Sequence, residues 1–197
     1  MKKIKLSRLI FALGVLFLVL LFFFPIWSIT LTAPQYPDGI SMYIWINKIT
    51  GDTESTLQNI NILNHYIGMK FIEPDSIKEL TYFQFVIISM IILGVVITFI
   101  NKGWLKVSWV IILILLGIAG IYDFYLWEYD YGHNLSPIAP IKIPGMVYQP
   151  PVFGEKMLLN FKSESYPHLG SLWMFLSIVL CTFSLIIQKK ESRNEKK

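Results

Sequence analysis

Apolar residues are concentrated in four long runs, and most polar residues lie in the stretches between them. The runs cover residues 9–29, 83–100, 107–127 and 169–188. Each run is close to the roughly 20 residues that an α-helix needs to cross about 30 Å of hydrocarbon. The pattern therefore predicts four transmembrane helices, with two long loops between them, at residues 30–82 and 128–168.

The composition agrees with a membrane protein. Of the 197 residues, 54% are hydrophobic and 15% are charged, and the mean hydropathy is +0.56, well above that of ordinary soluble domains. The second and third runs are joined only by residues 101–106, so they should be antiparallel neighbours. We expect the first run to be an uncleaved anchor, because it is too long for the apolar part of a signal peptide. The whole chain, 1–197, then forms a single integral membrane domain.

Both long loops contain signals of local structure. In the first loop, residues 41–50 are rich in aromatic and β-branched types and predict a strand. Residues 55–68 have helical spacing, with Ser55 as N-cap and Gly68 as C-cap. The second loop contains six prolines, which argue against helix and favour a rigid extended chain. The predicted fold class is thus an all-α membrane protein with two folded outer loops, which should pack on each other because both are rich in aromatics.

The distribution of Lys and Arg predicts the orientation. Eleven of the 17 basic residues lie in the N-terminal arm, in the turn at 102–106 and in the tail at 189–197. Basic residues near the ends of spanning helices are retained on the cytoplasmic side. Both termini should therefore be cytoplasmic, with the two long loops on the outer side.

Histidine and methionine in the outer loops are candidate metal ligands. All three histidines fall there, and imidazole with thioether is a ligand set that suits copper, with thioether favouring Cu(I). His65 and Met69 are four residues apart, although Gly68 makes it doubtful that they share a helix. The candidate ligands are His65, Met69, His133 and Met146. The alternative is that these side chains pack the interior of the loops.

Two acids near the end of the third run are candidates for proton or metal handling. Asp123 is the one acid within an apolar run, and Asp130 lies seven residues later on the same helical face. A carboxylate within a membrane segment is a candidate functional group by default. The alternative places Asp123 at the interface, hydrated or paired with a lysine.

Several function classes lack support in the sequence. With Cys181 as the single cysteine, no intramolecular disulfide can form. We find no phosphate-binding loop, metalloprotease motif or nucleophile elbow, so no enzyme is indicated. The clusters of basic residues are explained by topology, which leaves nucleic-acid binding unsupported.

Four segments carry a resemblance to a known family. "APQYPDG", "LNHYIGM", "YDYGHNLSPIAPIKIPGM" and "YQPP" followed by "KMLLNF" resemble the small multi-helix membrane proteins encoded in clade II nitrous oxide reductase gene clusters, the NosB-like proteins. The resemblance implies a bacterial cytoplasmic membrane protein that supports this periplasmic copper enzyme, by handling copper or by scaffolding partner proteins. It also favours one outer docking surface, for which the candidate residues are Tyr66, Gly68, Pro144, Gly145 and Tyr148.

Two other functions remain open from the sequence. One is a membrane subunit that passes electrons from quinol to a periplasmic reductase, with Asp123 taking a proton. Because the chain has neither a haem-binding motif nor iron–sulfur ligands, that role requires a bound quinone or a partner that carries the cofactor. The other is a structural subunit of a transporter.

Overall fold

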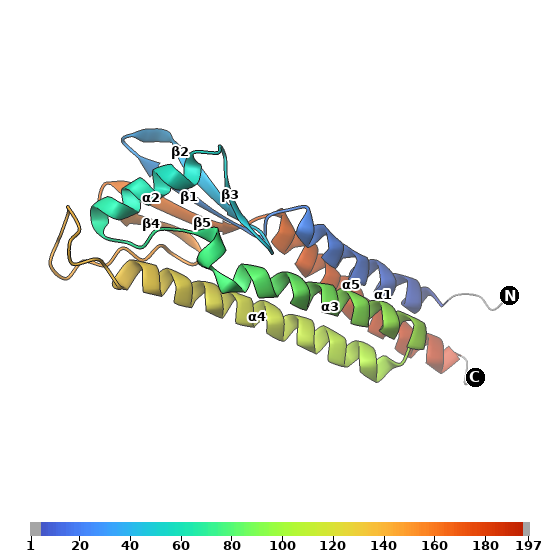
Figure 1. Ribbon diagram of the computed structural model, residues 1–197. Coiled ribbons are helices and arrows are strands. Elements are labelled where there is room, and N and C mark those ends of the chain that lie inside the picture. The colour runs from blue at the N-terminus through green and yellow to red at the C-terminus, as the bar shows by residue number, and fades with distance from the viewer. Residues whose placement is uncertain (1–4, 195–197) are drawn as a thin grey trace.

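The computed structural model describes residues 5–194 and places a helix bundle at one end of the molecule and a β-sheet at the other (Figure 1). The helices are α1 (Leu6–Phe17), the 3-10 helix η1 (Leu18–Phe22), α2 (Thr56–Ile67), the 3-10 helix η2 (Pro74–Ser76), α3 (Lys78–Ile100), α4 (Gly103–His133) and α5 (Leu169–Asn194). The strands are β1 (Trp27–Ala33), β2 (Tyr36–Ile44), β3 (Ile49–Gly51), β4 (Gly154–Leu158) and β5 (Phe161–Pro167).

The fold is mixed α/β, so our prediction of an all-α protein with four membrane spans is wrong. Within residues 5–194, three helices are long and apolar enough to cross a membrane, namely α3, α4 and α5. The first apolar run divides into a shorter helical stretch, Leu6–Phe22, and strand β1. Pro25 lies at the break, and the β-branched and aromatic residues after it favour a strand. Apolar content alone cannot distinguish such a buried strand from a continuing helix.

The sheet combines both of the predicted outer loops. Its strand order is β3-β2-β1-β5-β4, and every neighbouring pair is antiparallel. The central pairing joins β1, which follows the first helix, to β5, which precedes the last, and it sets Ile29 opposite Ser165. The prediction that the two loops pack on each other is therefore confirmed.

One face of the sheet is buried under helices α2 and α4. Residues 29, 31 and 33 of β1 alternate toward this face, as the two-residue period of a strand requires. Ile60 from α2 and Tyr131 from α4 belong to the same apolar core as these strand residues. The last turns of α4 thus serve as part of the sheet domain (Figure 1).

The local predictions had mixed outcomes. Helix α2 is confirmed, with Gly68 as a left-handed C-cap with φ of 81°; Ser55 occupies the N-cap position, but its side chain makes no capping hydrogen bond. The strand predicted at 41–50 instead divides at a turn into the end of β2 and β3. The β4–β5 hairpin was not predicted. Most prolines of the second loop lie in its irregular part, residues 134–153, and they predicted an extended chain for the whole loop.

The bundle is held together by close contact between α1 and α5. Gly14 lies so near α5 that a Cβ atom there would be 2.6 Å from the Cys181 sulfur. Cys181 is buried and free. Small residues at a helix interface allow such close packing. On the outside of the bundle, apolar side chains such as Ile92 and Phe99 are exposed, as expected for helices that face lipid.

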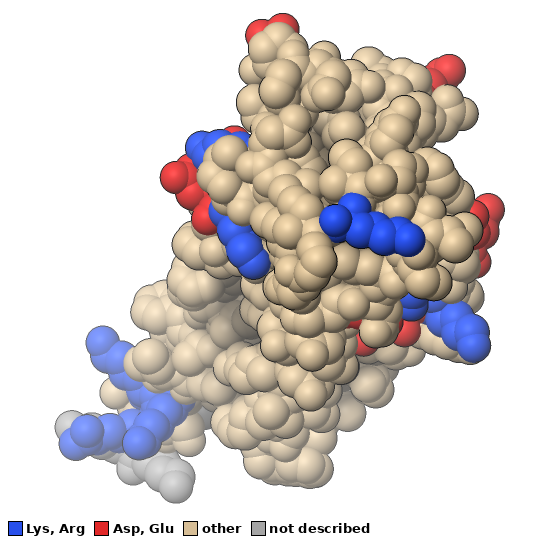
Figure 2. All heavy atoms as spheres, turned by 90° about the vertical axis from the view of Figure 1, so that its left-hand side faces the viewer, with Lys and Arg blue, Asp and Glu red and all other residues tan. Residues whose placement is uncertain are grey.

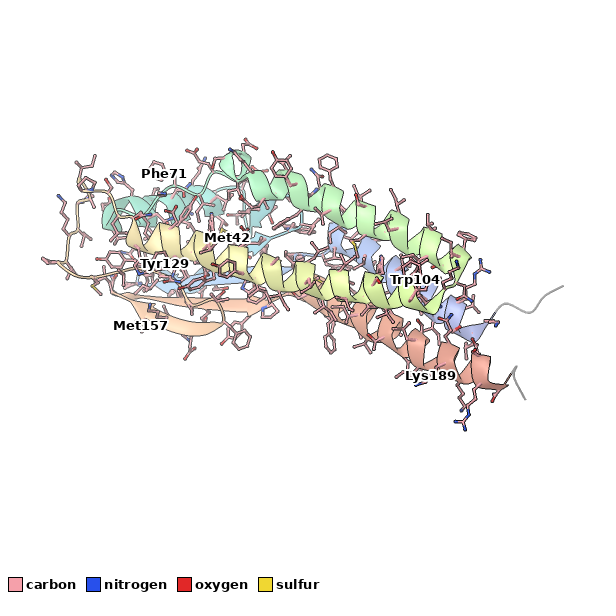
Figure 3. All side chains as sticks on the ribbon, turned by 90° about the horizontal axis from the view of Figure 1, so that it is seen from below. Met42, Phe71, Trp104, Tyr129, Met157 and Lys189 are labelled. Atoms are coloured by element: carbon pink, nitrogen blue, oxygen red, sulfur yellow. The ribbon has the colours of Figure 1, made fainter. Side chains whose placement is uncertain are left out.

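The two ends of the molecule differ in their charged groups. Both described ends of the chain and the α3–α4 turn lie at the bundle end (Figure 1), where Figure 3 labels Trp104 and Lys189. The opposite end carries the sheet and the irregular loop. Viewed from that end, most of the surface is uncharged, with acidic side chains mainly toward its rim and basic side chains both at the rim and nearer the middle (Figure 2).

Candidate functional site

The end of α2 positions the first candidate motif. Gly68 adopts a left-handed conformation that residues with a side chain rarely take, and this ends the helix. The backbone nitrogen of Met69 then donates to the carbonyl oxygen of Asn64 over 2.9 Å. Met69 therefore leaves the helix but stays beside it, near the turn that carries His65.

The irregular loop after α4 packs directly on this helix end. The nitrogen of Ser136 donates to the Gly68 carbonyl over 2.7 Å, and the nitrogen of Ile141 donates to the Tyr66 carbonyl over 2.9 Å. The fit is close, because a Cβ on Gly68 would lie 2.8 Å from the Ala139 Cβ. Two motifs that are about 70 residues apart in sequence thus form one surface.

A hollow of about 190 Å³, here called the His65 hollow, lies at this junction. Its lining comprises His65, Gly68, Met69, Lys70, Phe71, Ser136, Ile138 and Ala139. His65 is exposed, and its ring stacks on Phe71 with 6.2 Å between ring centroids. An imidazole and a thioether therefore line one surface hollow, which is large enough for a metal ion or for a side chain of a partner.

The other two predicted copper ligands do not line this hollow. The His133 ring stacks on Tyr129 at 3.8 Å, and its Nδ1 lies 3.0 Å from the Tyr129 carbonyl oxygen, to which it can donate. Met146 is partly buried and packs against the core of the sheet domain. The structure thus brings His65 and Met69 together but does not join them to His133 and Met146. In the described part of the chain, no group of three or more His, Cys, Asp or Glu residues could hold a metal ion.

The predicted docking residues divide between surface and core. Tyr66 is half exposed, and Pro144 and Gly145 lie in an exposed turn in which Gly145 has a φ of 75°. Tyr148 is only 1% exposed and belongs to the core of the sheet domain. Tyr66, Pro144 and Gly145 are thus accessible to a docking partner, whereas Tyr148 is not.

The two predicted acids occupy different surroundings. The Asp130 carboxylate accepts a hydrogen bond from the Lys70 ammonium at 2.5 Å and another from the Asn134 side chain. Both members of the Lys70–Asp130 pair are substantially exposed. Asp123 is partly exposed on α4. Asp130 therefore links the segment after α2 to α4 through its ion pair with Lys70.

Sequence reasoning missed the acid that the fold buries. Glu128 is 0% exposed, and neither of its carboxylate oxygens has a hydrogen-bond partner in the part of the chain that the structure describes. It lies at helical spacing from Tyr131 and Gly132, which are also buried, so one stripe of α4 faces the sheet domain. Asp123 and Asp130 lie off that stripe. The helical spacing of Glu128, Tyr131 and Gly132 is visible in the sequence, but it indicates burial only when the position of the sheet is known.

Comparison with known proteins adds no further assignment. No protein-family model matches the chain, and no curated protein matches it.

Proposed function

We propose that this protein is an accessory protein of nitrous oxide reductase, anchored in the bacterial cytoplasmic membrane, that handles copper at its outer surface. The observation that carries the proposal is the His65 hollow. The motif around residues 65–69 and the segment after His133, both part of the resemblance, meet there through backbone hydrogen bonds. His65 and Met69 both line this hollow.

The chemistry of this pair suits a passing copper ion. A neutral imidazole and a thioether are both ligands for Cu(I). Two protein ligands at a surface leave coordination positions that a partner can fill, which favours transfer over permanent storage. Tyr66, Pro144 and Gly145 are exposed, so a partner could dock on them.

The proposed orientation places the sheet outside the cytoplasm. The described basic residues of the bundle end include Lys102, Lys189, Lys190 and Arg193. Basic residues at helix ends are retained on the cytoplasmic side, so the sheet and the His65 hollow would face the periplasm or the exterior.

Cysteine labelling tests this orientation. Because native Cys181 is buried, a membrane-impermeant maleimide should give little background. A Met157→Cys variant on the sheet should react in intact cells, whereas Trp104→Cys at the opposite end should react only after lysis. Reaction of Trp104→Cys alone in intact cells would reverse the proposed orientation.

The function is tested by the copper content of the reductase. In a strain that lacks the native gene, the wild-type protein should restore copper loading, and His65→Ala should restore it poorly. Met157→Leu is the matched control, because Met157 is 62% exposed on edge strand β4 and lies outside the hollow (Figure 3). Full copper loading and full reductase activity with His65→Ala would contradict copper handling at this site.

A further inference from the structure

A second cavity lies deeper, between the end of α4, the end of α2 and the buried face of the sheet. This cavity, here called the Glu128 cavity, has a volume of about 40 Å³. Its polar lining groups are those of Asn64, Trp127, Glu128 and Tyr131, and the remainder of its wall is apolar or methionine. The volume exceeds the roughly 10–15 Å³ that a single water requires, so a small ion fits.

The carboxyl group of Glu128 makes no hydrogen bond with the cavity wall, and the indole nitrogen of Trp127, which also lines the cavity, is likewise buried without a partner among the described residues. No Lys, Arg or His is among the lining residues. Both carboxylate oxygens lack a donor among residues 5–194. A buried carboxylate in apolar surroundings is strongly unfavourable unless it holds a proton or contacts a cation. The cavity therefore contains a carboxyl group that must either hold a proton or contact a cation.

The other donors at the cavity identify the kind of cation. Met42 and Met69 both line it, and Met42 is only 2% exposed. Met42 lies on strand β2 and belongs to the buried core of the sheet domain, and Figure 3 labels it beside α4 in projection. Ca²⁺ and Mg²⁺ require about six oxygen ligands, and the wall does not supply them. Thioethers select soft ions such as Cu(I), which accept few ligands.

Met69 also connects this cavity to the surface. It lines both the His65 hollow and the Glu128 cavity. A single flexible thioether at the boundary could release an ion from His65 toward Met42 and Glu128. The hollow would then be the entrance and the cavity the interior site.

We propose that the Glu128 cavity binds one Cu(I) ion through the thioethers of Met42 and Met69 and the carboxylate of Glu128. The carboxylate neutralises the charge of the ion, and the two sulfurs supply the soft ligands. The binding site itself rests on the cavity and its donors, whereas the use of the ion rests on the proposed function. No bond other than the metal–ligand contacts forms, and the oxidation state of copper does not change.

Binding of Ag(I), a redox-inert probe for Cu(I), tests the proposal on the full-length protein in detergent. We expect competition with a soft-metal chelator to reveal one bound ion. Glu128→Gln and Met42→Leu should each weaken binding at least tenfold, because each removes a ligand while nearly conserving side-chain volume. Met157→Leu, an equally conservative change outside the cavity, should bind as the wild type does. Equal affinity in all four proteins would overturn the proposal.

Thermal stability supplies a second readout that does not depend on the affinity measurement. Ag(I) should raise the melting temperature of the wild type, because a ligand that binds only the folded state stabilises it. Glu128→Gln should melt at or above the metal-free wild type and show no shift with Ag(I). If Glu128 merely holds a proton, the shift with Ag(I) will be the same in both proteins, and the proposal fails.

The role of His65 separates this inference from the proposed function. If His65→Ala abolishes Ag(I) binding while Glu128→Gln leaves it intact, the ion sits in the His65 hollow, and only the interior site is wrong. If no protein binds Ag(I), the interior site is overturned. The proposed function is then judged by the copper content of the reductase alone.

Discussion

The backbone nitrogen of Ser136 donates a 2.7 Å hydrogen bond to the carbonyl oxygen of Gly68, and this contact joins the end of α2 to the loop that follows α4. It exists because the chain at Gly68 turns into a left-handed conformation with φ of 81°. The same turn directs Met69 away from the helix. A local backbone requirement thus creates both the contact between the two motifs and the wall of the His65 hollow.

Gly68→Ala should therefore destabilise the protein. A side chain at positive φ costs about 1–2 kcal/mol, and the new Cβ would also meet Ala139 at 2.8 Å. Gly145→Ala is the matched control, since Gly145 has a φ of 75° but no atom within 4 Å of an added Cβ. Melting temperatures in detergent should fall for both variants, and further for Gly68→Ala. Equal losses would show that the contact with the loop contributes nothing.

The contact between α1 and α5 leads to a prediction for the bundle. An added Cβ at Gly14 would lie 2.6 Å from the Cys181 sulfur and 3.1 Å from the Ser177 carbonyl oxygen. Overpacking of this kind costs about 1–3 kcal/mol, so Gly14→Ala should lower the melting temperature and make the Cys181 thiol more reactive. Gly120→Ala is the control, because nothing lies within 4 Å of its added Cβ. That change should be neutral or slightly stabilising.

For Lys106 we predict a substitution that does not lower the stability of the protein. Its side chain is 0% exposed in the bundle, and its ammonium has no hydrogen-bond partner among the residues described. The ammonium lies 5.2 Å from the centre of the Phe11 ring, a contact worth up to about 2 kcal/mol. Taking an ammonium out of water costs several kcal/mol, and this desolvation outweighs the attraction of the Glu191 carboxylate, so the penalty is the larger effect.

Lys106→Met should therefore leave the melting temperature unchanged or raise it. Methionine keeps the length of the side chain and removes its charge. The measurement is thermal unfolding in detergent, with Lys102→Met as a control for loss of a basic residue in the same turn. A marked loss of stability confined to Lys106→Met would show that the ammonium makes a favourable interaction that outweighs its burial.

The parts of the fold that depend on short-range signals could be predicted from the sequence. Helix α2 ends at Gly68 as predicted, because the left-handed C-cap is decided within a few residues, whereas Ser55 occupies the N-cap position without a capping hydrogen bond from its side chain. The long apolar helices α3, α4 and α5 follow from length and composition. The change from helix to strand after Phe22 could not be predicted in the same way. Trp27–Ala33 becomes β1 because it pairs with β2 and β5, and β5 lies more than 120 residues later.

In the candidate site, too, short-range features could be predicted and those that depend on distant contacts could not. His65 and Met69 were found from residue type and spacing, and they do line one hollow. Glu128 was passed over for Asp123, because the sequence places both acids near a membrane boundary and does not tell which face of α4 meets the sheet. Burial of a carboxylate depends on contacts that are distant in sequence, and here those contacts come from β1, β2, β5 and α2.

The closest approach between α4 and the loop leads to the last prediction. A Cβ on Gly132 would lie 2.3 Å from the Cα and 2.4 Å from the nitrogen of Gln149, and backbone atoms cannot give way as a flexible side chain can. The neighbouring nitrogen of Tyr148 donates to the Gly132 carbonyl over 3.0 Å. Gly132→Ala must therefore push residues 148–150 away from the helix, including Pro150, which lines the Glu128 cavity.

We expect Gly132→Ala to cost about 1–3 kcal/mol of unfolding free energy and to speed hydrogen exchange in residues 146–152. Exchange should rise there because the bond from Tyr148 is broken, while α3 keeps its protection. Gly120→Ala, an identical change in the same helix with no neighbouring atoms, is the control. Displacement of the loop should open the Glu128 cavity to water at Pro150. Gly132→Ala should therefore also reduce the rise in melting temperature that Ag(I) produces. Unchanged stability and unchanged exchange in this variant would mean that the loop does not close the cavity.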